Sequence, residues 1–494
     1  MPALPRGIDG VLTQHPEAGT LPFSPADVAA AHYRKVGEGW VVTNDMGQHA
    51  ILNETEFRGY LAGTLDKDSE AWLELRQKGF LKKYLDFERH IEDYRSKNSF
   101  LFTAAALHIL VTTARCNHKC LYCHSSVVGE KKKGVDMTPA HAKRAVDIAF
   151  ECPNPDISFE FQGGEPTLNW PIIEYVTKYA RLKNEASGRG VFLSLVTTFS
   201  TMNEERFKFL IDEKISICTS LDGPAELHNR NRIYTGGNSQ EGTVAWIKRF
   251  LDYQDDRGRR PFKPGALMTT TRLSMEYGTQ VIDQYLELGL PGIFLRPLSP
   301  IGFAKRSWDK IGYTAEEYLA FYRKNLEYIL ELNYKGTKFF ERMARTLLVK
   351  ILSRRDPIYV DLRSPSGAGL GVIGYDYDGS VYTGDEARML AAEGNATFKI
   401  GHVESSRYND LVDHPLVKAA AVASLLENQP VCSQCVYKPY CGQDCTYNLQ
   451  TQNTLWGRMP DNGRCRIFMG VFDILFEKLQ DPKARAVFEG WLKE

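Results

Sequence analysis

The strongest constraint on the fold is a regular alternation of two kinds of segment between residues 105 and 300. Short apolar runs, typical of strands, alternate with longer stretches in which apolar residues recur every three or four positions, as on one face of a helix. Six such repeats predict an α/β fold with a parallel sheet and right-handed helical crossovers, arranged as a partial barrel or a doubly wound sheet. The expected strands are 105–113, 157–162, 191–197, 215–220, 264–271 and 292–297, and the expected helices are 138–150, 170–184, 203–213, 240–253 and 277–289.

Length and charge narrow the class of protein. A chain of 494 residues is long enough for about three domains. Lys and Arg together number 61, as do Asp and Glu, so the net charge is zero and no basic excess indicates nucleic-acid binding. The N-terminus lacks the pattern of a signal peptide, and the longest apolar stretch, 100–113, is too short to span a bilayer. We therefore expect a cytoplasmic protein without nucleic-acid or membrane partners.

The segments that flank the repeats have patterns of their own. Residues 39–52 hold two apolar runs around a turn at Asn44-Asp-Met-Gly, which predicts a hairpin, and helical patterns follow at 54–62 and 69–78. This combination resembles a winged-helix fold, which either recognises a peptide or only packs against the rest of the chain.

Beyond the repeats, two amphipathic helices are expected within 301–360, a hairpin over 371–383 with its turn at Asp378-Gly379, and a closing helix over 465–479. The expected domains are an N-terminal unit at 1–98, the repeats at 99–300, a helical linker at 301–365 and a C-terminal domain at 366–494.

Eight of the ten cysteines fall into two groups, which in a long chain indicates metal ligation rather than disulfides. The first group directly follows the first expected strand in a C-x3-C-x2-C pattern. Three thiolates can hold three irons of a 4Fe–4S cluster and leave the fourth iron open, whereas zinc would need a further ligand such as His118 or His124. The isolated Cys152 and Cys218 are interpreted as small core residues. The first group is Cys116, Cys120 and Cys123, and the second is Cys432, Cys435, Cys441, Cys445 and Cys465.

With Tyr122 directly before its last cysteine, the first group resembles the loop of the radical S-adenosylmethionine (radical SAM) superfamily. The resemblance implies a partial (β/α)6 barrel in which Cys116, Cys120 and Cys123 bind a 4Fe–4S cluster. S-adenosylmethionine would chelate the open iron and, after one-electron cleavage, yield a 5′-deoxyadenosyl radical that abstracts hydrogen from a C–H bond.

Other strand ends carry matching motifs. Gln162-Gly-Gly-Glu-Pro follows the second strand, and the resemblance implies that this segment binds the methionine amino group of S-adenosylmethionine. Thr197-Thr-Phe-Ser departs from the family's Thr-Asn-Gly, and Ser-Leu-Asp-Gly-Pro follows the fourth strand. Arg296 either binds a carboxylate or forms a surface salt bridge. The candidate cofactor-binding residues are Gly163, Gly164, Glu165, Ser200, Ser220, Asp222 and Arg296.

The second cysteine group resembles the SPASM extension of radical SAM enzymes, which implies that Cys432, Cys435, Cys441 and Cys465 hold one auxiliary 4Fe–4S cluster. Four thiolates would suit zinc equally well. In the family, the remaining cysteine joins two upstream cysteines on a first auxiliary cluster. Here Ser366-Gly-Ala-Gly and Gly379-x4-Gly384 replace both upstream positions, so no standard first cluster is expected. Cys445 is then either a spectator or a ligand to a cluster completed by a group such as Asp385.

Segments including Thr219-Ser-Leu-Asp-Gly-Pro and Tyr382-Thr-Gly-Asp-Glu-Ala-Arg are similar to the His-Xaa-Ser system radical SAM maturases. This likeness implies an enzyme that abstracts hydrogen from a residue of a ribosomally made precursor peptide and so forms a crosslink or another oxidative change. The implied partners are the precursor, a reducing protein such as a flavodoxin or ferredoxin, and a second maturase. The alternatives are a formylglycine-type protein radical dehydrogenase and a non-catalytic, zinc-stabilised peptide adaptor.

Asp385 is the candidate catalytic base. It directly follows Gly384, and in some SPASM relatives an acid at this place is proposed to deprotonate the substrate. The alternative is that Asp385 and Glu386 only stabilise the N-terminus of a short helix, where acids are favoured.

Overall fold

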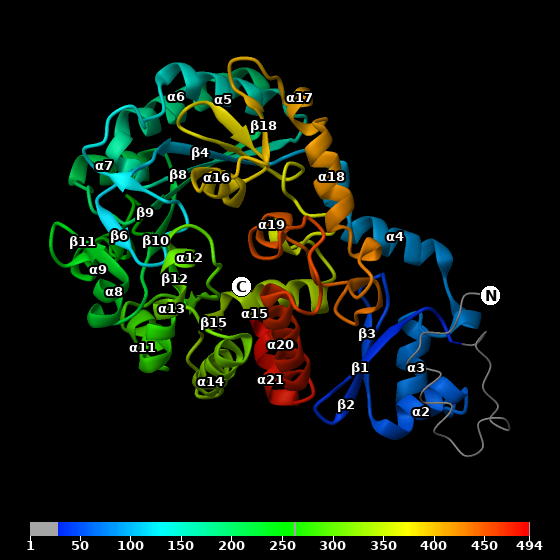
Figure 1. Ribbon diagram of the computed structural model, residues 1–494. Helices are drawn as coiled ribbons and strands as arrows, with labels where there is room; N and C mark the ends of the chain where they lie inside the picture. The colour runs from blue at the N-terminus through cyan, green and yellow to red at the C-terminus, as the bar shows by residue number, and fades with distance from the viewer. Residues whose placement is uncertain (1–27, 261–262, 494) are drawn as a thin grey trace.

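The computed structural model describes residues 28–260 and 263–493. At its centre, six strands form a curved parallel sheet in chain order, with helices on the outer side (Figure 1). This confirms the predicted partial barrel. The strands are β4 (Leu107–Thr113), β8 (Asp156–Gly163), β9 (Gly190–Thr197), β10 (Ser216–Ser220), β12 (Gly265–Thr269) and β14 (Leu295–Arg296).

The helices between these strands form close to their predicted positions. Thr138, Asn203 and Asn238 fix three of them by accepting a hydrogen bond from a backbone N–H of the first turn. Two short helices, α8 (Ala225–Asn231) and α10 (Arg272–Tyr277), are additional to the prediction. The predicted helices are α5 (Pro139–Glu151), α6 (Trp170–Ser187), α7 (Glu204–Asp212), α9 (Ser239–Leu251) and α11 (Gln280–Glu287).

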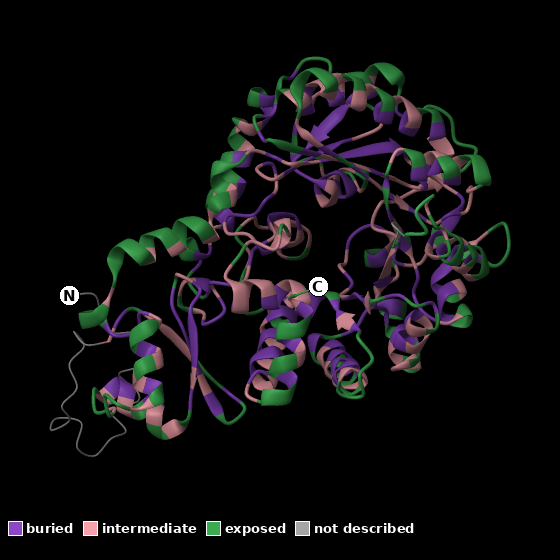
Figure 2. Cartoon of the chain, turned by 180° about the vertical axis from the view of Figure 1, so that it is seen from behind, coloured by how far each residue is buried: buried purple, intermediate pink, exposed green. Residues whose placement is uncertain are grey.

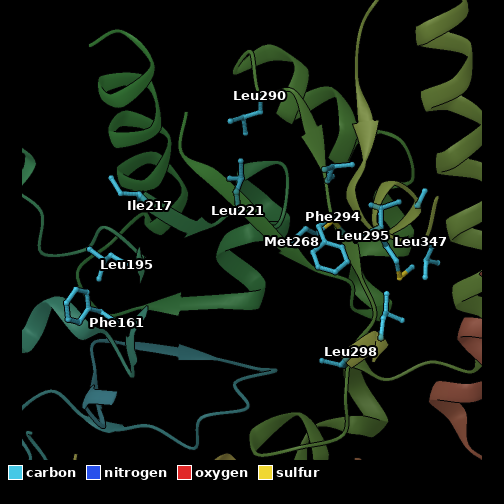
Figure 3. Packing of buried hydrophobic residues seen from close by; sticks show 14 of the residues in the cluster. Phe161, Leu195, Ile217, Leu221, Met268, Leu290, Phe294, Leu295, Leu298 and Leu347 are labelled. Carbon is cyan, nitrogen blue, oxygen red and sulfur yellow. The ribbon is translucent and has the colours of Figure 1, made fainter. Parts of the chain in front are cut away.

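The main core lies between the sheet and these helices. Phe161, Leu195 and Ile217 come from the adjacent strands β8, β9 and β10 and pack in a row (Figure 3). The helices bury their inner faces and expose their outer ones (Figure 2). Burial of one such side chain contributes about 1.5–3 kcal/mol, so this row is a main source of stability for the sheet.

The N-terminal unit has its own small core beneath a three-stranded antiparallel sheet. The predicted hairpin forms as β2 (Gly39–Thr43) and β3 (His49–Leu52), and the predicted helices as α2 (Glu54–Ala62) and α3 (Glu70–Gln77). An additional edge strand and a mostly exposed helix complete the unit: β1 (His32–Val36) and α4 (Phe87–Lys97).

The C-terminal half extends the central sheet. The predicted hairpin forms as β16 (Val372–Tyr375) and β17 (Ser380–Tyr382). Because β16 pairs in parallel with β4 and β17 pairs with β18 (Lys399–His402), the sheet has nine strands. The remaining strands and helices lie outside the central sheet, except β18, which is at its edge. They are β5 (Arg115–Cys116), β6 (His118–Cys120), β7 (Val128–Gly129), β11 (Arg232–Tyr234), β13 (Gly292–Ile293), α12 (Phe303–Arg306), α13 (Trp308–Ile311), α14 (Ala315–Tyr334), β15 (Phe340–Glu341), α15 (Arg342–Leu348), α16 (Asp385–Ala392), β18 (Lys399–His402), α17 (Tyr408–Val412), α18 (Pro415–Ser424), α19 (Cys445–Gln452), α20 (Gly463–Lys478) and α21 (Pro482–Trp491).

Two of these helices correspond to the pair predicted within 301–360, namely α14 and α15, and α20 corresponds to the predicted closing helix. The division into four domains stays a prediction. Among the described residues, no helix is both long and apolar enough to cross a membrane.

Replacing Phe161 by Ala tests how far the sheet depends on its core. Because Phe161 is fully buried, the substitution should lower the free energy of unfolding by about 3–5 kcal/mol, measured by denaturant titration. Phe192 lies on the neighbouring strand but is 59% exposed, so Phe192→Ala is the matched control. Equal losses from the two variants would contradict this account of the core.

Candidate functional site

A cavity of about 2220 Å³ opens at the carboxyl ends of the barrel strands, where parallel α/β folds place their active sites. The three thiols of the first cysteine group line it. Thus the structure brings together most of the predicted site residues. Those that line the cavity are Cys116, Cys120, Cys123, Gly163, Gly164, Glu165, Ser220, Arg296 and Asp385.

Two of the candidate cofactor-binding residues, Ser200 and Asp222, lie elsewhere. The Ser200 hydroxyl donates a hydrogen bond to Asn117 Oδ1, 2.9 Å away, so it contacts the cysteine loop. Asp222 is fully buried and does not line the cavity. Its predicted contact with S-adenosylmethionine or substrate therefore has no support from its position.

Asp222 instead anchors the cysteine loop. Its Oδ2 accepts a hydrogen bond from the Tyr122 hydroxyl at 2.6 Å and pairs with Arg232 Nε at 3.3 Å. The Arg232 guanidinium also lies over the Tyr122 ring, 5.1 Å from its centre. Tyr122, the aromatic residue before the last cysteine of the motif, thus connects the cysteine loop to Asp222, just beyond the end of β10.

The turn at Gly163 and Gly164 holds the end of β8 against the start of the cysteine loop. The backbone N–H of Gly164 donates to Thr113 O, and that of Glu165 donates to Arg115 O, both at 2.8 Å. A Cβ atom on Gly163 would lie 2.3 Å from Thr113 O, and Gly163 has a φ of +153°. Only glycine permits this close approach.

Glu165 presents a buried carboxylate to the cavity. One oxygen accepts hydrogen bonds from Thr167 and from the Thr197 hydroxyl, and the other from the backbone and hydroxyl of Thr198. These donors satisfy the charge in the buried position. Sequence reasoning missed the role of Thr197 and Thr198, although their place at the end of β9 could have indicated it.

The three thiols lie in an environment that does not favour thiolates by itself. Burial raises the pKa of Cys120 to about 12 and also raises the pKa of Cys116 and Cys123. A bound cation or cluster would be needed to stabilise the thiolates. Three cysteines from one loop beside an open cavity fit a 4Fe–4S cluster with one free iron.

Zinc fits this loop less well. Both ring nitrogens of His118 are hydrogen-bonded, to Asn117 Oδ1 at 3.0 Å and to Ser239 Oγ at 2.8 Å, so this histidine is not free to ligate a metal. His124 lines the cavity, and its buried Nε2 is unpaired. In the part of the chain that the structure describes, no group of three or more His, Cys, Asp or Glu could hold a single metal ion.

The family comparison agrees with this geometry. Residues 110–257 match the family model described as the radical SAM superfamily. The chain is an enzyme with a radical SAM domain. It is 22% identical over 379 residues to the cysteine-type anaerobic sulfatase-maturating enzyme of Clostridium novyi, covering 74% of this chain and 92% of the relative.

Two solved structures share the fold. Native anSMEcpe with bound AdoMet and Cp18Cys peptide superposes with a TM-score of 0.62 at 20% identity, covering 78% of this chain and 99% of that one. Streptococcus suis SuiB bound to precursor peptide SuiA gives a TM-score of 0.52 at 14% identity, covering 89% of this chain and 99% of SuiB.

Four cysteines of the second group lie close enough to affect one another's ionisation. Burial, and then repulsion between the thiolate forms of neighbouring cysteines, raises the pKa of Cys432 and Cys465 to about 12 and that of Cys435 to about 11. Cys441 is near Arg464, a cation that would offset the negative charge of a cluster, and near Lys350, whose pKa burial lowers to about 7. The four thiols therefore form a candidate auxiliary-cluster site.

Cys445 has different surroundings. It is buried in an apolar cluster with Tyr382, Phe398 and Ala420, and its thiol donates to the carbonyl of Ala420 at 3.5 Å. These are the surroundings of a core cysteine, which favours the spectator interpretation.

Replacing Asp222 by Asn tests the anchor of the cysteine loop. The substitution leaves the buried Arg232 charge without its partner, so the free energy of unfolding should fall by about 3–5 kcal/mol. Asp309→Asn, at an exposed position, is the matched control and should change it by less than about 0.5 kcal/mol. Denaturant titration measures both; a similarly small effect at Asp222 would show that the ion pair does not hold the loop.

Proposed function

We propose that this enzyme is a peptide or protein maturase that removes a hydrogen atom from a residue of a ribosomally made precursor, leading to a crosslink or another oxidative change. The observation that carries the proposal is the convergence of three cysteine thiols, the Glu165 carboxylate and Arg296 on one large cavity of a radical SAM domain. With a 4Fe–4S cluster on the cysteines, bound S-adenosylmethionine supplies the radical that abstracts hydrogen.

The chain's own residues account for cofactor orientation. We infer that the Glu165 carboxylate accepts hydrogen bonds from the methionine ammonium group, because it is held rigidly at the cavity wall by Thr197 and Thr198. Arg296 lines the same cavity from β14, the edge strand of the sheet, and can bind a carboxylate. Ser220 is a further candidate contact at the end of β10.

A peptide substrate is supported by what the similar proteins are. The relative that matches over most of its length is named a sulfatase-maturating enzyme, and the two structural neighbours contain bound peptides. The first name favours, as a second candidate, a protein dehydrogenase of the formylglycine-forming kind. The cavity volume is large enough for both S-adenosylmethionine and a substrate side chain.

The remaining partners follow from this proposal. The winged-helix-like N-terminal unit would bind the precursor peptide, and a flavodoxin or ferredoxin would supply electrons. A second maturase acting on the same precursor and membership of the His-Xaa-Ser maturases belong to the same proposal.

Replacing Cys116, Cys120 and Cys123 by Ala tests the radical chemistry. Without these thiolates the open-iron cluster cannot assemble, so 5′-deoxyadenosine should no longer form from S-adenosylmethionine under reducing conditions, as measured by chromatography. Cys445→Ala is the matched control and should retain product formation. Undiminished 5′-deoxyadenosine from the triple variant would refute the assignment.

Metal analysis after anaerobic purification tests the auxiliary site. Two 4Fe–4S clusters predict about eight irons per chain and broad absorbance near 400 nm. Replacing Cys432, Cys435, Cys441 and Cys465 by Ala should remove about half of the iron and leave the first cluster. A colourless protein with stoichiometric zinc would instead favour the adaptor interpretation.

A further inference from the structure

A second cavity of about 800 Å³ adjoins the first and is lined by side chains from α15, α19 and α20, including Met343, Tyr447 and Phe468. The two cavities share part of their walls, including Arg296 and Glu386. The N-terminus of α16 lies at this junction, and Figure 1 shows α16 and α19 on the concave side of the sheet.

The two acids that begin α16 have different surroundings. Asp385 lines only the first of these two cavities, and its Oδ1 accepts a hydrogen bond from Nε of the buried Arg388 at 2.9 Å and forms an ion pair with Nη2 at the same distance. Arg388 also donates to Ser125 Oγ at 3.0 Å, two residues beyond the last cysteine of the loop. Asp385 thus connects α16 to the cysteine loop, and Arg388 occupies one of its two carboxylate oxygens.

Glu386 lines both cavities, and its side chain is 32% accessible. Its Oε1 lies 3.7 Å from Arg296 Nη2, which is longer than a direct hydrogen bond. The carboxylate therefore has a cation nearby but is free to contact a ligand that enters either cavity.

The charged groups around Glu386 are mostly acids. Burial, followed by repulsion of the ionised form by Asp361, Asp385 and Asp444, raises the pKa of Glu386 to about 8. Arg296 opposes this effect.

Three more groups line the second cavity. Arg464 donates a hydrogen bond to the backbone oxygen of Asp361 at 2.9 Å, and His124 and Tyr359 are further polar groups of the lining.

We propose that Glu386, rather than Asp385, accepts the proton that a substrate residue releases when it is oxidised at the junction of the two cavities. This rests on the proposed function. Oxidation of a carbon next to an O–H, N–H or S–H group removes one hydrogen atom, one electron and one proton and forms a new bond between the carbon and the heteroatom. The Glu386 carboxylate takes the proton; bound S-adenosylmethionine would supply the radical that takes the hydrogen atom, and a 4Fe–4S cluster on the cysteines would be the acceptor of the electron.

The pH dependence of two properties follows from this. Only ionised Glu386 can accept a proton, so product formation should rise with pH through about 8. The same shift affects stability in the opposite direction: in the unfolded chain the glutamate ionises near 4.5, whereas in the folded enzyme it holds its proton to about 8. Glu386 therefore lowers stability progressively as the pH rises from about 4.5 to 8.

The test compares Glu386→Gln, Glu386→Asp and Asp385→Asn in the full-length, cluster-loaded enzyme, with exposed Glu404→Gln as control. The probe is a candidate precursor peptide co-expressed with the enzyme. In Glu386→Gln the yield of modified peptide per 5′-deoxyadenosine should fall about a hundredfold and lose its rise with pH, and Glu386→Asp should restore part of it. Asp385→Asn should reduce this ratio far less.

A second readout does not depend on turnover. The melting temperature of Glu386→Gln minus that of the native enzyme should grow between about pH 5 and pH 8, which a purely packing role would not produce. Unchanged product yield in Glu386→Gln, or loss confined to Asp385→Asn, would overturn the assignment of Glu386 while leaving the proposed function intact. A native enzyme that forms no 5′-deoxyadenosine would overturn the proposed function and this proposal together.

Discussion

The position of the cysteine loop depends on a buried ion pair at the end of β10. Asp222 and Arg232 are both almost fully shielded from water, and Tyr122 donates a hydrogen bond to the same carboxylate. Asp222 Oδ1 also accepts a hydrogen bond from the backbone of Thr269 on β12. One carboxylate thus joins the cysteine loop, β11 and β12. In a low-dielectric interior, loss of any one partner leaves a charge or a dipole unsatisfied, so the loop has one strongly preferred position.

Periodicity and strand-end motifs were enough to predict the barrel, because both are local properties of the chain. Each strand of the six is a short apolar run bounded by turn residues, and the motifs at 162–166 and 220–224 mark strand ends directly. The pairing of β16 with β4 joins residues more than 260 positions apart, for example Val372 and Leu107, and no local pattern encodes it. For the same reason the hairpin at 371–383 was recognised but not its place in the central sheet.

The candidate site shows the same division. The sequence motifs predict residues that line the cavity, including Glu165 and Arg296. They do not predict the partners that hold these side chains in place. Thr198 contacts Glu165 through both its backbone and its hydroxyl. Its place at a strand end indicates that it lies near the site, but its partner becomes visible only once β8 and β9 are adjacent. Asp222 was assigned to the ligand because its motif matches the family, yet its side chain turns into the interior toward Arg232. A motif therefore identifies the segment at the site more reliably than the direction of each side chain.

The N-terminal unit and the second cysteine group are structurally interdependent. Tyr440 donates hydrogen bonds to the backbone of Gly47 and Gln48, and the buried Lys438 pairs with Asp45 at 2.8 Å. Thr43 donates to the backbone of Val436 at 2.7 Å.

All three of these C-terminal partners lie between Cys435 and Cys441, so the hairpin supports the segment that carries two of the four thiols. Removal of the hairpin would leave Tyr440 unpaired and expose the aromatic packing of Tyr437 on Phe472. Deletion of the unit would therefore disturb the auxiliary-cluster site as well as any peptide contact. Substitutions on its exposed surface are the cleaner way to separate peptide recognition from cluster assembly.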